Sequence, residues 1–282
     1  MPVEPVNLLR AQLHHLAIES SNPERLAEFY ARALRLEFTR DGDRFVGTGP
    51  ERCVVICPGR DKALAYAAYA VDSVEQLPVL RERVVRHGGR ELRSPTALFA
   101  EGAVCVADPD GNFLIFGVPR IPASDDCAVT LRARLQHVVV ASRDCVAMAQ
   151  FYERVLGFTL SDKVVDEEGA MRTAFLRSGV EHHTFAVFQA SENRLDHHCY
   201  EAGDWGLIRD WADYMTGWGI PIQWGPGRHG PGNNLFIFVH DADGNWVELS
   251  AELERVSAGR PVGVWPHEQR TLNLWGQGLM RS

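Results

Sequence analysis

The chain has 282 residues and a formal net charge of −8 at pH 7, and 45% of its residues are hydrophobic. A chain of this length and composition can bury one large core or two ordinary domains. No run of residues approaches the roughly 18 apolar residues of a membrane span, and the N-terminus lacks the pattern of a secretory signal. The acidic balance gives no basic field for a phosphate backbone, so we expect a cytoplasmic globular protein that binds neither nucleic acid nor membrane.

The cysteines give no sign of a zinc site or of a disulfide framework. The six are scattered without paired C-x-x-C spacing, and a chain of this length does not need disulfide bonds to stabilise its core. We therefore expect reduced and mostly buried thiols at Cys53, Cys57, Cys105, Cys127, Cys145 and Cys199.

The first half of the chain opens with a short apolar strand at Leu13–Ile18. A helix follows at Asn22–Phe38, where apolar residues recur at three-and-four spacing. After variable strand segments come a second apolar strand, Leu64–Val71, and an amphipathic helix. The half closes at Val106–Phe116, where a D-x-D-G-N turn precedes a final strand. Proline, serine and aspartate then mark a linker around Pro119–Leu131.

The second half repeats this order of elements. Its first strand, Leu135–Val140, begins 122 residues after its counterpart and leads into a helix at Arg143–Phe158. The strand Leu195–Ala202 precedes another amphipathic helix, and Val239–Leu249 again contains a D-x-D-G-N turn and a closing strand. The repeat indicates a duplicated architecture.

The repeated unit is β-α-β-β-β, used four times. One unit cannot bury its sheet face alone, so the two units of each half are expected to curl together. The sequence thus predicts an α+β fold of two tandem modules, residues 1–122 and 132–255. Each module is expected to contain a cupped mixed sheet with helices outside.

Two histidines and a glutamate stand out in the strands of the second half. His137 lies in the first strand, His197 in a later strand, and Glu248 midway along the last. Two neutral imidazoles and one carboxylate on the inner face of a cupped sheet form a facial triad, which leaves three positions open on Fe(II) for a diol and dioxygen. The alternative is two core histidines and a surface charge. It is disfavoured because a carboxylate within an apolar strand is costly unless it is paired or metal-bound.

The first half tests this assignment within the same chain. It has His15, Tyr66 and Ile115 at the three matching positions. Tyrosine and isoleucine each replace a ligand, so His15 has no other metal ligand to act with. We therefore expect one metal per chain and a first module that has lost its site.

Two further histidines are candidates for acid–base chemistry. His183 lies 14 residues before His197, enough for a strand, a turn and a return to the same mouth, and His229 lies in the loop segment W-G-P-G-R-H-G-P-G-N-N. An imidazole with a pKa near neutrality can take a diol proton and later return it. The alternatives are a polar edge residue and a purely structural loop. His182 and His198 are expected on the opposite strand face.

These motifs resemble the type I extradiol ring-cleavage dioxygenases of the vicinal oxygen chelate superfamily, whose members include glyoxalase-like and bleomycin-resistance-like proteins. The resemblance spans nearly the whole chain. It rests on L-Q-H at His137, H-H-T at His183, R-L-D-H at His197, G-P-G-R-H-G at His229 and D-A-D-G-N-W-V-E at Glu248.

The resemblance implies an enzyme with Fe(II), or with Mn(II) in some members, and a homo-oligomeric assembly. Its substrates would be a catechol and O2, and its catalytic module the C-terminal one. His183 matches the histidine beside the ligands that handles the oxygen intermediate, and His229 matches the loop histidine near the substrate hydroxyl.

Three residues are candidates for substrate contacts. Phe238 stands ten residues before Glu248, where the family commonly has a tyrosine, so one hydrogen-bond donor to the substrate is lost. Tyr200 is a candidate to compensate. The tail, residues 256–282, resembles the C-terminal lids of some homoprotocatechuate-cleaving members, in which an arginine meets a substrate carboxylate. Arg270 is the matching residue, and a surface-packed tail arginine is the alternative.

Two other functions stay open. One is another metal-dependent enzyme of the superfamily, an isomerase, lyase or transferase, although such enzymes usually place ligands in both paired modules. The other is a non-catalytic protein that binds an aromatic ligand or drug in its cupped sheets without a metal.

Overall fold

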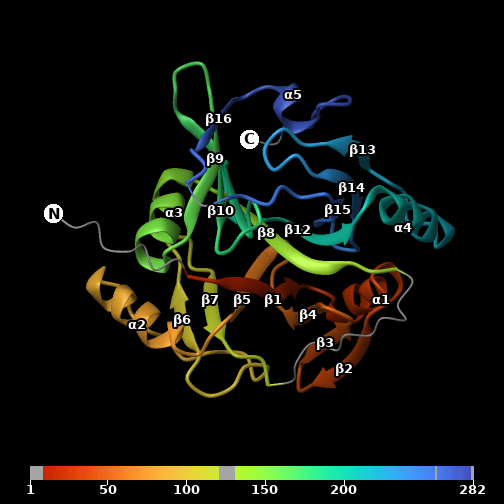
Figure 1. Ribbon diagram of the computed structural model, residues 1–282. Coiled ribbons are helices and arrows are strands. Elements are labelled where there is room, and N and C mark those ends of the chain that lie inside the picture. Colours follow the sequence, from red (N-terminus) through yellow and green to blue (C-terminus); the bar gives the residue numbers. More distant parts are fainter. Residues whose placement is uncertain (1–8, 121–130, 258, 281–282) are drawn as a thin grey trace.

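The computed structural model describes residues 9–120, 131–257 and 259–280. Figure 1 shows two modules, the first half of the chain below and the second half above, each built on one mixed sheet. The predicted α+β architecture of two tandem modules is confirmed. Most of the predicted linker, residues 121–130, lies outside the described residues.

The N-terminal module is built on seven strands. Its sheet has the order β2-β3-β4-β1-β5-β7-β6, and the pairs β1–β4 and β5–β7 are parallel. Its elements are β1 (Ala11–Ser20), α1 (Pro23–Ala33), β2 (Glu37–Asp41), β3 (Arg44–Gly49), β4 (Arg52–Pro58), β5 (Ala63–Val71), α2 (Gln76–Arg86), β6 (Val104–Ala107) and β7 (Phe113–Gly117).

The C-terminal module has a nine-stranded sheet of order β13-β14-β15-β12-β8-β11-β10-β9-β16. Its elements are β8 (Arg134–Ser142), α3 (Cys145–Phe151), the π-helical turn η1 (Tyr152–Leu156), β9 (Thr159–Val165), β10 (Met171–Arg177), β11 (Phe185–Gln189), β12 (Arg194–Gly203), α4 (Trp205–Gly217), β13 (Trp224–Arg228), β14 (Leu235–His240), β15 (Trp246–Ala251), β16 (Gly263–Pro266) and α5 (Gln269–Leu272). In the described part of the chain, no helix combines the length and the hydrophobicity needed to cross a bilayer.

The β-α-β-β-β repeat is complete in three of its four predicted copies. The second unit has the order β5-α2-β6-β7, and Leu92 makes only an isolated bridge to Cys105 where a further strand was predicted. The prediction of four complete units is therefore wrong for this one. Gly88 and Gly89 precede this segment and Pro95 lies within it, and a proline cannot donate a hydrogen bond to a strand ladder.

Polar side chains set the starts of helices and the shape of turns. Asn22, Asp144 and Asp204 stand just before α1, α3 and α4, and each accepts a hydrogen bond from a backbone N–H of the first turn. In the two D-x-D-G-N turns, Asp108 and Asp241 each accept hydrogen bonds from backbone N–H groups within the turn. These local signals explain why the boundaries of these elements follow the sequence pattern.

One hydrophobic core joins the two modules and contains the buried faces of α1 to α4. Tyr69 of the first module meets Phe158 of the second edge to face, with centroids 5.7 Å apart. Tyr30 donates a hydrogen bond to Asp241 at 2.7 Å, and its hydroxyl lies 2.8 Å from His198 Nε2. The cupped faces of the sheets carry separate clusters. His198 thus belongs to the module contact.

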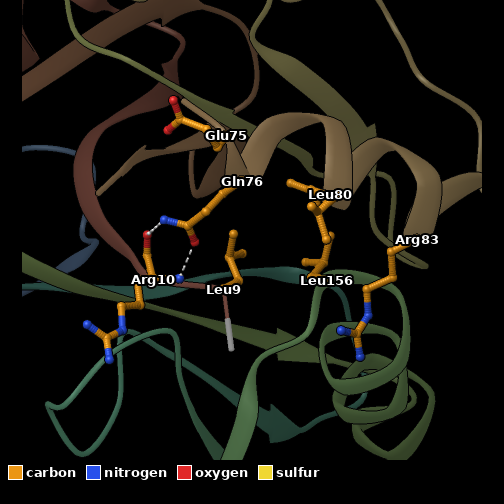
Figure 2. Close-up of a pocket in the computed structure, with 8 residues that line it drawn as sticks. Leu9, Arg10, Glu75, Gln76, Leu80, Arg83 and Leu156 are labelled. Atoms are coloured by element: carbon orange, nitrogen blue, oxygen red, sulfur yellow. Dashed lines mark hydrogen bonds between the residues drawn. The ribbon is translucent and has the colours of Figure 1, made fainter. Parts of the chain in front are cut away.

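A groove lies between α2 and the second module (Figure 2). The Gln76 side chain accepts a hydrogen bond from Arg10 N at 2.7 Å and donates one to Arg10 O at 3.3 Å. The guanidinium of Arg83 donates to the carbonyls of Glu153 and Arg154. Because Arg83 of α2 binds carbonyls of η1, the groove belongs to the contact between the two modules.

Candidate metal centre

Three neighbouring strands bring the predicted ligands together. In the sheet order β15-β12-β8, these strands carry Glu248, His197 and His137 respectively. The Nε2 atoms of the two histidines lie 3.3 Å apart, and Glu248 Oε2 lies 3.2 Å from His137 Nε2 and 3.3 Å from His197 Nε2. All three side chains are buried. The three ligand atoms therefore face one common point.

Hydrogen bonds leave Nε2 of each imidazole free for a metal. His137 Nδ1 lies 2.5 Å from Gln136 Oε1, and Gln136 Nε2 itself donates to a backbone carbonyl. His197 Nδ1 lies 2.7 Å from Asp196 Oδ1. Because amide and carboxylate oxygens only accept, Nδ1 carries the proton in both neutral rings, and each Nε2 presents a lone pair. Two lone pairs and the Glu248 carboxylate around one point attract a cation.

The donor set fits a six-coordinate divalent metal. Neighbouring ligand atoms on an octahedral ion with bonds of about 2.1–2.3 Å lie about 3.0–3.3 Å apart. The three atoms here lie 3.2–3.3 Å from one another. Two imidazole nitrogens and one carboxylate oxygen on one face leave the opposite face of the ion open, as in non-haem Fe(II) oxygenases.

Cys199 lies next to this set. It pairs with His137 on one side and with Glu248 on the other, and one ligand atom from each of these three residues falls within a 4.8 Å group. Its thiol donates to Ser250 Oγ at 3.2 Å, and burial raises its pKa well above the ordinary value. The two imidazole nitrogens and the carboxylate oxygen, at 3.2–3.3 Å from one another, form the candidate ligand set. The sequence analysis counted Cys199 only among the core thiols.

The electrostatics of the site favour a cation. Burial alone would raise the pKa of Glu248, but the imidazoles of His137, His197 and His229 beside it, which are cations when protonated, lower it well below the ordinary value. Burial lowers the pKa of His137. It acts on His197 in the same direction, but the hydrogen bond to Asp196 and the neighbouring Glu248 carboxylate raise the pKa of that ring overall. The result is an ionised carboxylate surrounded by imidazoles.

The two predicted acid–base histidines line the same pocket as the ligands. His229 Nδ1 lies 2.6 Å from the carbonyl oxygen of Leu272, so Nδ1 is the protonated nitrogen, and Nε2 lies 3.6 Å from Glu248 Oε1. The ring of His183 lies 4.4 Å from that of His137, centroid to centroid, and burial lowers the pKa of His183 well below the ordinary value. The structure thus brings both histidines to the candidate site.

Of the three predicted substrate contacts, Phe238 alone lines the pocket, and its ring meets that of His197 edge to face at 5.3 Å. The prediction that Tyr200 contacts substrate is wrong. Side chains alternate along β12, and Tyr200 is buried in the core between the modules. Arg270 is exposed and is not part of the lining, although Leu272 is. Its position fits the alternative, a surface arginine of the tail.

Several residues of the site were missed by the sequence analysis. Gln136 and Asp196 bind the ligand histidines, and Asn234 donates to Glu248 Oε1 at 3.1 Å. Gln136 and Asp196 could have been found from their position, because each immediately precedes a predicted ligand. The segment 225–228, expected as a loop, belongs to strand β13, which shifts register against β14 there. Its glycines and proline shape an edge strand.

The C-terminal tail closes one side of the pocket. β16 pairs with β9, and Thr271 and Leu272 of α5 contribute to the lining. Asp162 of β9 anchors the tail, because it accepts hydrogen bonds from the Trp265 indole and the Arg260 guanidinium, both at 2.7 Å. That the tail opens and closes as a lid, and that it begins at residue 256, stay predictions.

Family comparisons cover both modules. A model of the Glyoxalase/Bleomycin resistance protein/Dioxygenase superfamily matches residues 134–249, and a model of the glyoxalase-like domain matches residues 15–115. Each half of the chain therefore contains a glyoxalase-type domain. The two matches place its modules on the two halves of the repeat.

Two curated proteins are similar in sequence. Metapyrocatechase 2 of Cupriavidus necator is 26% identical over 241 residues, which cover 77% of this chain and 73% of that protein. Biphenyl-2,3-diol 1,2-dioxygenase of Pseudomonas sp. (strain KKS102) is 29% identical over 161 residues, which cover 51% of this chain and 55% of that protein.

Two solved structures share the fold over nearly the whole chain. The Mn(II)-bound glyoxalase from Novosphingobium aromaticivorans is 25% identical with a TM-score of 0.79, and the match covers 96% of this chain and 93% of that one. Homoprotocatechuate 2,3-dioxygenase from Arthrobacter globiformis is 22% identical with a TM-score of 0.81, covering 99% of this chain and 93% of that one.

Proposed function

We propose that the protein is a metal-dependent extradiol dioxygenase, which opens a catecholic ring next to its hydroxyl pair and incorporates O2. The observation that carries the proposal is the approach of two imidazole nitrogens and one carboxylate oxygen to within 3.2–3.3 Å of one another on a buried sheet face. The similarity to metapyrocatechase 2 and to a biphenyl-2,3-diol 1,2-dioxygenase supports it. We assign His137, His197 and Glu248 as ligands of Fe(II), with Mn(II) as the alternative metal.

A divalent metal held by His137, His197 and Glu248 would supply a Lewis-acidic centre for a catecholate and O2. The protein supplies the proton transfers. His229 holds its Nδ1 proton against Leu272 O, which leaves Nε2 as the acceptor for a proton from the substrate hydroxyl. Burial lowers the pKa of His183 and favours its neutral form. We assign this histidine to a hydrogen bond with the O2-derived oxygen atoms.

A glyoxalase-type isomerase or lyase is the second candidate, favoured by the likeness to the Mn(II)-bound glyoxalase. The first module argues against ligands shared between paired modules. His15 Nε2 is engaged with Thr96 Oγ1 at 2.9 Å, and Tyr66, Phe99 and Ile115 pack into an apolar cluster on that cupped face. The ligand set of the second module is therefore the candidate metal site.

Oxygen consumption separates these functions. The purified protein is loaded with Fe(II) anaerobically, a panel of catechols is added, and O2 uptake is followed together with the yellow ring-opened product. We expect O2 and catechol to disappear in equal amounts. Iron binding without oxygen uptake would support the isomerase class, and no iron binding would support a non-catalytic protein that binds aromatic ligands.

We further propose that the protein works in the cytoplasm as a homo-oligomer, with a small-molecule catechol as its partner and no nucleic-acid ligand. The net charge of −8 supports the last point. Size-exclusion chromatography with light scattering measures the assembly, and we expect a mass above that of one chain.

A further inference from the structure

We infer that the pocket accepts catechols whose ring substituent is uncharged and apolar. This inference rests on the proposed function, and it names the substrate class of the same site. It is carried by the two walls that flank the metal face, because these walls contact whatever the ring carries beyond its hydroxyl pair.

The first wall is built from β8, β10 and β11. Val139 and Phe188 form a small buried cluster against which Phe175 packs. The Phe188 ring lies 6.4 Å from that of His197, and the Phe175 ring meets that of His183 edge to face at 5.2 Å. This wall therefore runs past a ligand and past a candidate acid–base residue.

The second wall comes from β13, β14 and the tail. Trp224 and Phe238 are stacked with their centroids 5.1 Å apart and an interplanar angle of 23°, and Leu272 packs against the same cluster. Phe238 also meets the His197 ring. The ligands thus lie between two largely aromatic walls, which suit a flat ring and its apolar substituents.

The described lining of the pocket offers no lysine or arginine to a substrate carboxylate. Among the described lining residues, the titratable side chains are the three assigned ligands and the two acid–base histidines, and none is a lysine or an arginine. Asn234 donates to Glu248 through Nδ2, and the Thr271 hydroxyl donates to Pro266 O. Asn234 Oδ1 has no hydrogen-bond partner among the described residues, but an amide oxygen only accepts and so cannot pair with a carboxylate. A carboxylate on the substrate would lose its hydration in this pocket without gaining a cation, which is costly.

An apolar substituent has the opposite balance. Each methylene that leaves water for an apolar wall strengthens binding about fourfold. We therefore expect 4-ethylcatechol to bind more tightly than 4-methylcatechol, and both to bind more tightly than 3,4-dihydroxybenzoate or 3,4-dihydroxyphenylacetate.

Binding to the Zn(II)-loaded protein tests this order without turnover. Calorimetric titration with the four catechols is expected to give alkyl catechols at least about tenfold lower Kd values than the carboxylated ones. Carboxylated catechols that bind equally or more tightly, or no binding by any of the four, would overturn the inference. Oxygen uptake by the Fe(II)-loaded protein is scored separately. The expected binding order without oxygen uptake would contradict the dioxygenase proposal and leave the pocket inference standing.

A matched pair of variants tests the second wall. Leu272 is only partly buried, so a longer side chain can be accommodated there. Leu272→Arg is expected to shift the preference toward 3,4-dihydroxyphenylacetate by at least about tenfold, because it adds the missing cation, whereas Leu272→Met retains the preference for alkyl catechols. An unchanged preference in Leu272→Arg, with an intact circular dichroism spectrum, would contradict the placement of this wall.

Discussion

Gln136 and Asp196 each stand directly before a ligand histidine and accept from its Nδ1. For Asp196 the backbone explains this contact between sequence neighbours, because the pairing of β12 with β8 shifts register between Leu195 and His197. The irregularity places a carboxylate beside the imidazole that it orients. The chemistry of the site therefore depends on residues that do not themselves touch the metal position.

Asp196→Leu removes the acceptor at nearly constant volume, and we expect metal affinity to fall roughly 10–100-fold. Asp196→Asn keeps an oxygen that can accept from Nδ1, so its loss is expected to be smaller. Competition with a chelator measures both affinities. Equal losses in the two variants would show that the hydrogen bond does not orient the ligand.

Exchange of single histidines tests the assignment of modules. His197→Ala is expected to abolish both iron retention and oxygen uptake, because it removes a ligand. His15→Ala is expected to keep both and to lose about 1–3 kcal/mol of unfolding free energy, since His15 is buried and engaged with Thr96. Metal analysis and chemical denaturation give the two readouts. Loss of metal in His15→Ala would show that the metal site had been assigned to the wrong module.

His229 offers a substitution that separates its two nitrogens. In His229→Asn the side-chain amide can still donate to Leu272 O, but nothing replaces Nε2. We expect metal content to be unchanged and kcat/KM to fall roughly 10²–10⁴-fold, the usual contribution of a general base. Full activity in this variant would remove His229 from the mechanism.

At the scale of elements, the Asp162 carboxylate adds side-chain hydrogen bonds to the backbone pairing between β9 and the tail strand β16. Burial alone would raise the pKa of Asp162, but the neighbouring side chains of His182, Arg260 and Trp265 lower it below the ordinary value of 3.8. His182 Nε2 lies 3.1 Å from Asp162 without the alignment of an ideal hydrogen bond, so we attribute most of the effect to Arg260 and Trp265.

The sign of the pH dependence follows from this shift. A carboxylate whose pKa is lowered by folding stabilises the folded state above its unfolded pKa, and this contribution is lost as the pH falls further. We expect Asp162→Asn to cost roughly 1.5–3 kcal/mol near neutral pH and to lose less stability than the wild type on acidification below about pH 4. Urea denaturation across pH measures both effects, and parallel curves would contradict the assignment.

Local patterns predicted most elements because their causes are local. Apolar periodicity, the residues before helices and the D-x-D-G-N turns act within a few positions. The same parity that placed His198 on the far side of β12 also applies to Tyr200, which lies three residues after His197. That error was avoidable. The place of Arg270 was not predictable, because it depends on the path of the tail over β9.

At the scale of the whole molecule, duplication made the ligand set visible. The first half has Tyr66 and Ile115 where the second half has His197 and Glu248, so the comparison of the halves exposed these two ligands. The contacts between the halves left no such signal, since Tyr30, His198 and Asp241 lie far apart in sequence. Such contacts depend on how the finished modules pack.

Tyr30→Phe tests whether the two modules unfold as one. The variant leaves the buried Asp241 and His198 without their shared hydroxyl, so we expect a loss of about 1–3 kcal/mol in unfolding free energy. Because one core spans both modules, denaturation is expected to stay a single transition. Two separate transitions in the wild type would contradict the shared core.

Anomalous diffraction at the iron edge, from crystals soaked anaerobically with Fe(II), tests the central claim most directly. We predict one peak per chain, bordered by Nε2 of His137, Nε2 of His197 and the carboxylate of Glu248. A peak beside His15, or one bound through Cys199 in place of His197, would contradict the account.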